Sequence, residues 1–285
     1  MAPMVEQRGI AEAVHQAPRF APRDKSRACW CCGVANGFRE VRFSTVCGVA
    51  TLKEVQPLVS TILDLHSHSE ASEDSRAPLE AYLNWLKLRR AERPVNGIVL
   101  TEHRQFNKDA DYRSLEDKFD ILVLKASEVE TDYGHMLVFG VTDEMTRRFD
   151  FANVHLPAQE VIDGIAEMGG IVIPCHPGRP NVGLFEHYSK KAPLDNVVAV
   201  EVYNGGSRKG EDERSQQLAE RFGYQQIGGS DSHLVSLIGL CGTRFDGDIH
   251  NVEELVSELK RGAFEPVDFR PRRKPVQPAV AVEVK

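Results

Sequence analysis

The sequence lacks several features that would place it in a large class of proteins. It has no run of about 18 apolar residues, so we expect no membrane-spanning helix. Its first residues do not form the apolar stretch of a secretory signal. Six cysteines among 285 residues are too few for a disulfide framework, which favours a reducing compartment. We therefore predict a cytoplasmic protein that does not bind membranes.

Signatures of nucleotide cofactors and of nucleic-acid tracks are also missing. The chain contains neither G-x-G-x-x-G nor a Walker A sequence, so a nucleotide cofactor is not indicated. It carries 35 basic and 42 acidic residues, a net charge of −7, and the acidic excess lies in the centre between mildly basic ends. An acidic centre without interleaved aromatic residues argues against long nucleic acid as a partner.

Composition divides the chain into three segments. Residues 1–60 show no periodicity and contain four of the six cysteines, so we predict an N-terminal extension that is flexible in part. The C-x-C-C spacing of Cys29, Cys31 and Cys32 does not match the paired C-x₂-C motif of zinc knuckles. Residues 265–285 alternate prolines with arginines and are predicted to form an extended basic tail. The folded domain is therefore expected over residues 61–264.

Short apolar runs alternate with helical patterns inside this domain. The pattern predicts helices over residues 78–91, 157–168, 214–222 and 251–261. It predicts strands over 61–65, 96–100, 121–125, 136–141, 170–173, 197–202 and 224–228. This alternation favours an α/β fold with a largely parallel sheet and helices outside it, either as a barrel or as an open sheet.

Histidines and carboxylates stand at the ends of these strands. Residues two apart on a strand project from the same face, so His66 and His68 can bind one ion together, and so can Asp231 and His233. In a barrel, the carboxyl ends of the strands meet at one mouth. The other residues placed in this way are His103, Glu128, His135 and His176. Imidazole and carboxylate ligands suit Zn, Mn or Fe, so the sequence predicts a polynuclear metal site.

The same positions carry a family resemblance. The motifs resemble, in order and over residues 61 to 245, those of the polymerase and histidinol phosphatase (PHP) family. They are Asp64-Leu65-His66-Ser67-His68-Ser69, Thr101-Glu102-His103, Glu128, Gly134-His135, His176-Pro177 and Gly229-Ser230-Asp231-Ser232-His233. The resemblance implies a distorted (β/α)7 TIM-like barrel, two to three divalent metal ions and hydrolysis of phosphate esters.

The resemblance also implies how the ligands are shared among three metal positions. The first would be held by His66, His68, Glu128 and Asp231, and the second by Glu128, His135 and His176. The third would be held by His103, His233 and one acidic residue after the His-Ser-His motif. The family spacing favours Asp74 for that ligand, whereas a shorter variant of the family places it at Glu73.

These ligands predict a reaction. Two cations about 3.5–4 Å apart can supply hydroxide near neutral pH and offset the charge of a phosphoryl group. We predict a hydrolase of small phosphate esters, of the phosphomonoester or nucleotide type, that uses a metal-bridging hydroxide held by Glu128 and Asp231. Arg179, Arg104 and Arg208 are the candidates for binding the phosphate, and a solvated loop arginine is the alternative for each.

Two other activities fit the same residues. The hydroxide can instead attack a carbonyl, which gives a hydrolase of amide or C–C bonds, or the enzyme can be a nuclease acting on short nucleic acids. Cys175 is expected to point away from His176 and to be a core thiol. Tyr203 and Asn204 are candidates for lining the pocket, and Glu201 for a structural role.

Overall fold

Residues 60–271 are described in a computed structural model. The predicted N-terminal extension, except residue 60, and residues 272–285 of the predicted tail lie outside this range. The described part is an α/β fold. Its strands are β1 (Thr61–Ser67), β2 (Gly97–His103), β3 (Leu122–Thr131), β4 (Gly134–Phe139), β5 (Ile171–Pro174), β6 (Ala199–Asn204), β7 (Gln225–Gly229), β8 (Cys241–Phe245) and β9 (Phe264–Asp268). Its helices are α1 (Leu79–Leu88), α2 (Arg113–Phe119), α3 (Asp143–Arg148), α4 (Ala158–Glu167), α5 (Leu184–His187), α6 (Glu211–Phe222) and α7 (Val252–Arg261).

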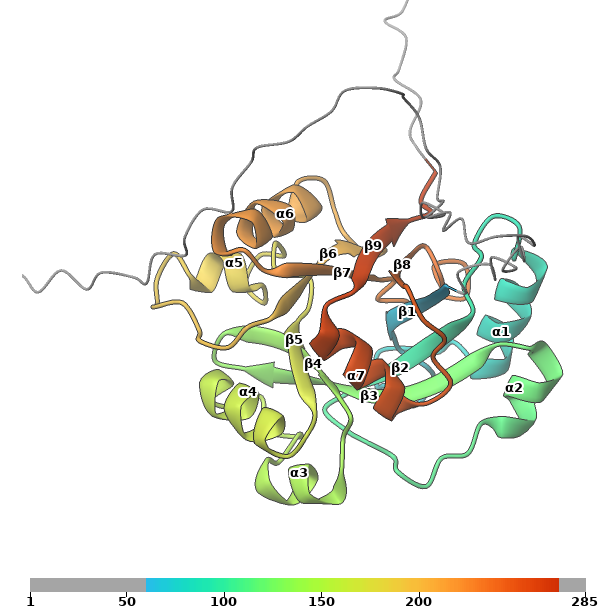
Figure 1. The fold of residues 1–285 in the computed structure, drawn as a ribbon, viewed down its shortest axis with the longest axis horizontal. Coiled ribbons are helices and arrows are strands. Elements are labelled where there is room, and N and C mark those ends of the chain that lie inside the picture. Colours follow the sequence, from blue (N-terminus) through green and yellow to red (C-terminus); the bar gives the residue numbers. More distant parts are fainter. Residues whose placement is uncertain (1–59, 272–285) are drawn as a thin grey trace, which may run out of the picture. The chain divides into compact units, whose positions relative to one another are not determined.

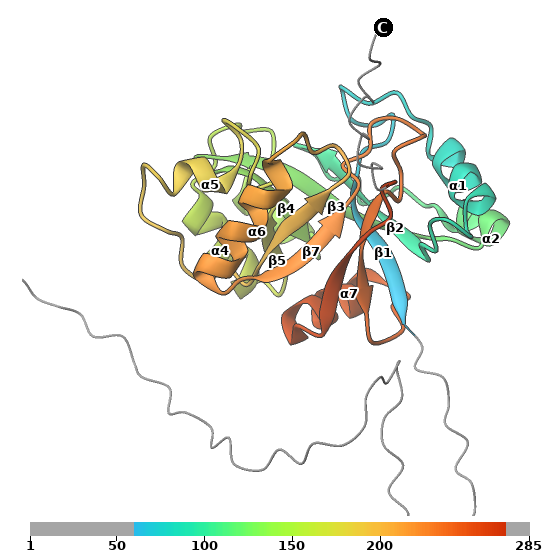
Figure 2. The same ribbon diagram turned by 90° about the horizontal axis from the view of Figure 1, so that it is seen from above.

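The strands form a curled sheet that resembles an incomplete barrel. Seven strands are hydrogen-bonded in the order β5-β4-β3-β2-β1-β8-β9, and β6 and β7 form a separate parallel pair. β6 lies beside β5, and β7 lies beside β1, so the pair occupies the gap in the ring. Figures 1 and 2 show α1 and α2 on one side of the strands and α4 to α6 on the other, and Figure 1 shows α3 near α4. The TIM-like α/β fold predicted from the sequence is therefore confirmed.

The expectation of a largely parallel sheet was wrong at two strands, β4 and β8. β1, β2 and β3 are parallel, but β4 runs antiparallel to both β3 and β5. Only Asp132 and Tyr133 separate β3 from β4, and a connection this short cannot carry the chain back for a parallel strand. β8 pairs antiparallel with β1 and with β9.

The seven predicted strands correspond to β1 to β7, whereas β8 and β9 were not anticipated. β9 also crosses the predicted domain boundary at residue 264, because its backbone pairs with β8 as far as Asp268 opposite Cys241. The start of the predicted tail, up to Asp268, is thus part of the sheet. Among the helices, α2, α3 and α5 were not predicted.

The hydrophobic core has an inner layer and two outer layers. On β3 the inward-facing positions alternate through Leu122, Leu124 and Ala126, and the next residue of this row is Glu128. The inner layer also includes Leu255, Val256 and Leu259 of α7. This helix packs near the start of β5, where Lys260 Nζ donates to Gly169 O at 2.6 Å. The end of the ring that carries Glu128 is left open to form a site.

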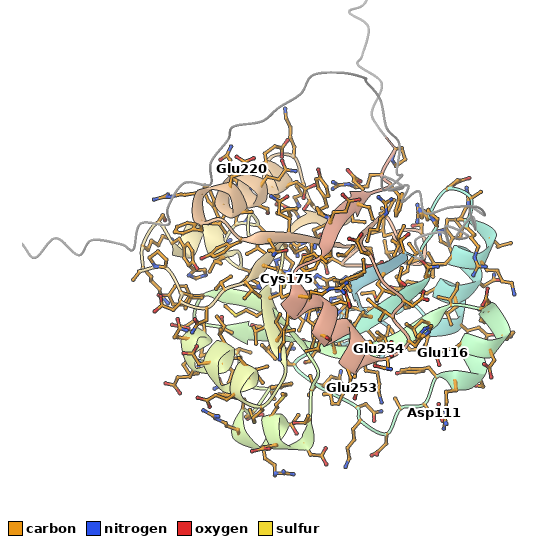
Figure 3. The ribbon with its side chains drawn as sticks, viewed as in Figure 1. Asp111, Glu116, Cys175, Glu220, Glu253 and Glu254 are labelled. Atoms are coloured by element: carbon orange, nitrogen blue, oxygen red, sulfur yellow. The ribbon has the colours of Figure 1, made fainter. Side chains whose placement is uncertain are left out.

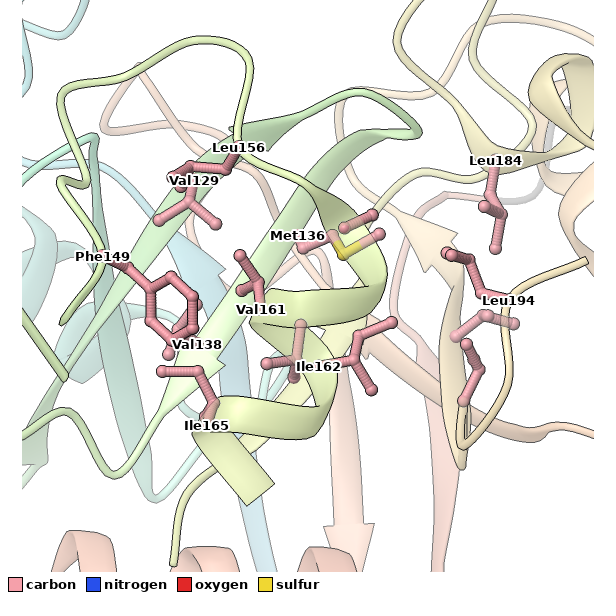
Figure 4. Close-up of a cluster of buried hydrophobic side chains, with 14 of the residues drawn as sticks. Val129, Met136, Val138, Phe149, Leu156, Val161, Ile162, Ile165, Leu184 and Leu194 are labelled. Carbon is pink, nitrogen blue, oxygen red and sulfur yellow. The ribbon is translucent and has the colours of Figure 1, made fainter. Parts of the chain in front are cut away.

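The outer layers lie between the strands and the surrounding helices. Figure 4 shows α4 placing Val161, Ile162 and Ile165 against the strands. On the other side, α1 buries Tyr82, Leu83 and Leu86. None of the helices between residues 60 and 271 has the length and apolar character needed to cross a membrane.

Candidate metal centre

A bulge in β1 turns two histidines into the ring. Leu63 and Leu65 both belong to the inner core, so regular alternation would point His66 outward. The pairing register with β2 shifts between Asp64 and Ser67, which inserts an extra residue. His66 and His68 then follow Leu65 on the inner side, and both side chains are fully buried.

Two further site residues adopt a left-handed backbone. His176 has φ 31° and Asp231 has φ 49°, values that are uncommon for residues other than glycine and cost about 1–3 kcal/mol. Hydrogen bonds hold them in place. Asp231 N donates to His66 O at 2.7 Å, and His176 N donates to a Glu201 carboxylate oxygen at 2.8 Å. Both side chains are thereby aimed at β1 and β3.

One oxygen of Glu128 lies in a first group of four ligand atoms. Glu128 Oε2 is 3.0 Å from His66 Nε2 and 3.1 Å from His68 Nε2. Asp231 Oδ1 is 3.4 Å from each of these ring nitrogens. All four residues are buried, and their geometry is suited to hold one metal ion.

The other oxygen of Glu128 faces a second group. Glu128 Oε1 is 2.7 Å from His135 Nδ1 and 3.1 Å from His176 Nε2. The thiol of Cys175 also points at this oxygen, with Sγ at 3.4 Å. Glu128 thus stands between two sets of imidazoles, one for each of its oxygens.

A third group surrounds Asp74. Its Oδ2 is 3.1 Å from His233 Nε2 and 3.4 Å from His103 Nε2. Both rings stack on His68, with ring centroids 4.4 Å and 4.1 Å away, so the third group adjoins the first. Glu73 pairs instead with Arg104.

Hydrogen bonds fix which nitrogen of three imidazoles faces the centre. His66 Nδ1 lies 3.1 Å from Glu201 Oε1, and His68 Nδ1 lies 3.4 Å from Ser72 Oγ. His233 Nδ1 lies 3.0 Å from the carbonyl oxygen of Asp231. The acceptors at Glu201 and Asp231 require a proton on Nδ1, and Ser72 can accept one. In the neutral form of each ring, which is the form that binds metal, Nε2 therefore carries the lone pair. The Ser72 hydroxyl is itself directed to Glu102, which leaves its oxygen free to accept.

This arrangement brings lone pairs together. His66 Nε2 and His68 Nε2 are only 3.1 Å apart, and two carboxylate oxygens face the same point. His176 Nδ1 is buried, and no group among residues 60–271 forms a hydrogen bond with it. Acceptors that converge in a buried place need a cation between them. The donor set, imidazole with carboxylate, therefore fits divalent metal ions.

When no metal ion is bound, protons on the imidazoles supply the positive charge between the converging acceptors. Burial alone would lower the pKa of His66, but the nearby carboxylates of Glu201, Asp231 and Glu128 raise it well above its ordinary value. Burial would likewise lower the pKa of His68, and hydrogen bonds to Asp231 and Glu128 raise it to about 9. Metal binding must displace these protons.

Glu201 and Asn204 form a supporting network behind these ligands. Besides His66, Glu201 accepts from Asn204 Nδ2 at 2.9 Å, and it is fully buried. Asn204 Nδ2 also lies 3.3 Å from Asp231 Oδ2. From the sequence, Glu201 was expected to have a structural role only. The sequence feature that could have revealed its contact with the ligands is a carboxylate within an otherwise apolar strand, because a buried charge needs a specific partner.

The predicted direction of Cys175 was wrong, although it is a buried thiol as expected. Ile171, Ile173 and Cys175 alternate into the ring, so the thiol faces Glu128 and lies in the interior. Figure 3 labels Cys175. The positive φ of His176 breaks the alternation, so that Cys175 and His176 both face inward although they are adjacent in sequence. Burial raises the pKa of the Cys175 thiol well above its ordinary value.

The three predicted arginines lie around the opening of the centre. Arg179 Nη2 donates to Asp231 Oδ2 at 2.6 Å and to Asn204 Oδ1 at 3.2 Å. A pocket of about 210 Å³ over the metal groups is lined by Arg104 and Arg179. A second pocket, of about 480 Å³, is lined by Arg179 and Arg208 and shares Asp231 and His233 with the first.

Comparisons with known proteins agree with this geometry. Residues 210–264, which include Asp231 and His233, match the PHP-associated family (PHP_C). The sequence matches no curated protein. The fold is similar to that of PsfC from Pseudomonas syringae PB-5123, with a TM-score of 0.54 and 16% identity over 73% of this chain and 91% of PsfC.

A similar fold also occurs in the lesion-specific endonuclease PfuEndoQ from Pyrococcus furiosus. The TM-score is 0.55 and the identity 17%, over 73% of this chain and 58% of the endonuclease. A structure of Endonuclease Q with a 27-mer duplex substrate, which has an abasic lesion at its active site, gives a TM-score of 0.53 and 15% identity. These TM-scores show a shared fold, and the family model matches only residues 210–264 of this chain.

Proposed function

Taking the chain as a PHP-family protein, we propose that it is a metal-dependent hydrolase of small phosphate esters. The observation that carries the proposal is the position of Glu128. One of its oxygens faces His66 and His68, and the other faces His135 and His176. A buried carboxylate shared in this way is suited to bridge two cations.

In this proposal the chain holds two to three divalent ions, Zn, Mn or Fe. The ligands of the first position are His66, His68, Glu128 and Asp231. Those of the second are Glu128, His135 and His176, and those of the third are Asp74, His103 and His233. When bound, such ions supply Lewis acidity and lower the pKa of water toward neutrality. Glu128 and Asp231 hold the place where the attacking water is deprotonated.

Arg179 supports a phosphate substrate. Its Nη2 is directed to Asp231 and Asn204, while among the described residues no partner is bonded to its Nε or Nη1. These nitrogens belong to a side chain that lines both pockets. A guanidinium with free donors at the rim of a metal centre is suited to bind phosphoryl oxygens. Arg104 and Arg208 add positive charge at the two pockets.

The size of the site favours small substrates. The larger of the two adjoining pockets, about 480 Å³, falls in the range of small-molecule sites, and the smaller adds about 210 Å³ over the metal groups. A second candidate, a nuclease acting on short nucleic acids, draws support from the fold shared with the lesion-specific endonuclease. Hydrolysis of an amide or C–C bond remains the third alternative from the sequence.

Metal analysis combined with a substrate panel tests the proposal. We expect at least two divalent ions per chain in metal-replete protein, and metal-dependent release of inorganic phosphate from monoesters or nucleotides. The panel includes cyclic diesters, short single-stranded DNA and an amide. Phosphate release from no ester, or fewer than two ions per chain, would overturn the proposal. Cleavage of the oligonucleotide alone would favour the nuclease.

Two neighbouring acidic residues give a matched pair for the third position. Asp74→Asn is expected to remove one bound ion per chain, because Asp74 faces His103 and His233. Glu73→Gln is expected to keep the full number, since Glu73 pairs with Arg104. Metal content by elemental analysis is the measurement. Equal loss in both variants, or loss only in Glu73→Gln, would contradict the assignment.

A further inference from the structure

The larger pocket beside the metal centre has an apolar wall. This name stands for the three apolar residues among the ten that line the pocket, Pro180, Leu234 and Leu237; the other seven are glycine or polar. The pocket shares Arg179, Asp231 and His233 with the smaller pocket over the metal groups, so the two lie side by side. A group attached to a phosphate at the metal centre would therefore extend along this wall.

The loop that carries the two leucines is fixed from within the fold. Arg93 Nη1 donates to the carbonyl oxygens of Ser236 at 2.9 Å and of Ile238 at 2.6 Å. Gly239 N donates to the buried carboxylate of Asp64 at 2.8 Å. The side chain of Ile238 is completely buried in the core of α1 and β2. The loop therefore has little freedom to fold its leucines away from solvent.

Leu234 remains exposed on this fixed loop. Its exposed fraction is 62%, and only Leu88 and Val198 are comparable large apolar side chains among the described residues. Of these three, Leu234 alone lines a pocket next to the metal groups. When an apolar ligand covers apolar surface that is held rigidly in water, the burial of that surface favours binding. The ligand that reaches it from the metal centre is the organic part of the substrate.

We propose that Leu234, with Pro180 and Leu237, selects phosphate esters whose alcohol is aromatic or otherwise apolar over esters of polyhydroxy alcohols such as sugars. This inference rests on the proposed phosphoesterase function and names its substrate class. Water adds OH to phosphorus and H to the departing oxygen, the ester P–O bond breaks, and the products are inorganic phosphate and the apolar alcohol. The alcohol lies against the wall before and after the reaction.

Two esters with similar chemistry and different organic groups test the proposal. Benzyl phosphate and glycerol 1-phosphate are both esters of primary alcohols, so they differ chiefly in apolar surface. We expect wild-type protein to prefer benzyl phosphate by about tenfold or more in kcat/KM. Leu234→Ala should lower kcat/KM for benzyl phosphate about fivefold and leave glycerol 1-phosphate unchanged.

Leu88→Ala is the matched control. It truncates the same residue type at a site that is 72% exposed and lies on α1. It should leave kcat/KM unchanged for both substrates. Equal rates with both esters in wild type, or equal effects of Leu234→Ala on both, would overturn the inference while the phosphoesterase function stood.

A binding measurement separates the two proposals. Benzylphosphonate and methylphosphonate cannot be hydrolysed, and calorimetry reports their affinities directly. Tighter binding of benzylphosphonate, weakened by Leu234→Ala and unchanged by Leu88→Ala, supports the apolar wall even when neither ester is cleaved. In that case only the hydrolytic function fails. Equal affinity of the wild-type protein for the two phosphonates would overturn the inference that the apolar wall selects the substrate.

Discussion

Glu201 shows how a residue outside the ligand set governs the metal centre. It lies within an apolar strand, β6, and its two oxygens serve His66 Nδ1, His176 N and Asn204 Nδ2. It thus sets the orientation of one imidazole and the backbone of another. Carboxylates that bind a ligand histidine in this way fix its tautomer and raise its basicity.

Glu201→Gln is therefore expected to weaken metal binding about 10- to 100-fold without unfolding the protein. The amide keeps the shape but loses the charge, and it presents only one accepting atom. Competition with a chelator measures the affinity, and circular dichroism checks the fold. Glu220→Gln, which alters an exposed carboxylate on α6 (Figure 3), is the control and should bind metal as wild type does. Unchanged affinity in Glu201→Gln would show that His66 needs no such partner.

At the scale of single elements, α1 illustrates what amphipathic packing contributes. Leu83 is fully buried against the outer face of the sheet, whereas Leu88, in the last turn of the same helix, is 72% exposed. Leu83→Ala is expected to lower the free energy of unfolding by about 2–5 kcal/mol, because it removes buried methyl groups and leaves a cavity. Leu88→Ala should change it by less than about 0.5 kcal/mol. Urea unfolding measures both, and comparable losses would mean that α1 does not pack as described.

The elements that sequence predicted well are those with a strong local pattern. β1 to β7 are apolar runs bounded by turn residues, and α1, α4 and α7 have regular apolar faces, while α6 buries Leu218 and Ala219 in its second half. β8 and β9, with the sequences Cys-Gly-Thr-Arg-Phe and Phe-Glu-Pro-Val-Asp, have no such pattern and form strands because neighbours pair with them. The direction of β4 followed from a two-residue connection rather than from its own residues.

The residues of the site, like the elements of the fold, were predictable where a local sequence pattern marks them. Placement at strand ends identified the residues that the fold brings together around Glu128 and Asp74. The bulge in β1 and the left-handed backbones of His176 and Asp231 depend on contacts with distant strands, so no local signal announces them. The orientation of Cys175 was missed for this reason.

Over the whole molecule, the metal centre joins the ends of β1 to β4 with the segments that follow β5 and β7. A ligand bound by all of these stabilises the folded state relative to the unfolded one. With free metal at 100 times its dissociation constant, the gain is about 2.7 kcal/mol, or about 5–10 °C in Tm. Scanning calorimetry with and without a chelator measures this shift. His68→Ala should reduce the shift, and an equal shift in the variant would place the bound ion elsewhere.

The ring closure described for β1 and β7 has a consequence for how the chain reaches its native state. Asp64 accepts from Ser230 N across 166 positions of sequence and from Gly239 N across 175. Contacts between such distant parts of a chain form slowly, because a long loop must be ordered first. His66 and Asp231 meet only once this closure is made. We expect metal uptake to follow the rate-limiting step, so that ion binding marks completed folding and does not nucleate it.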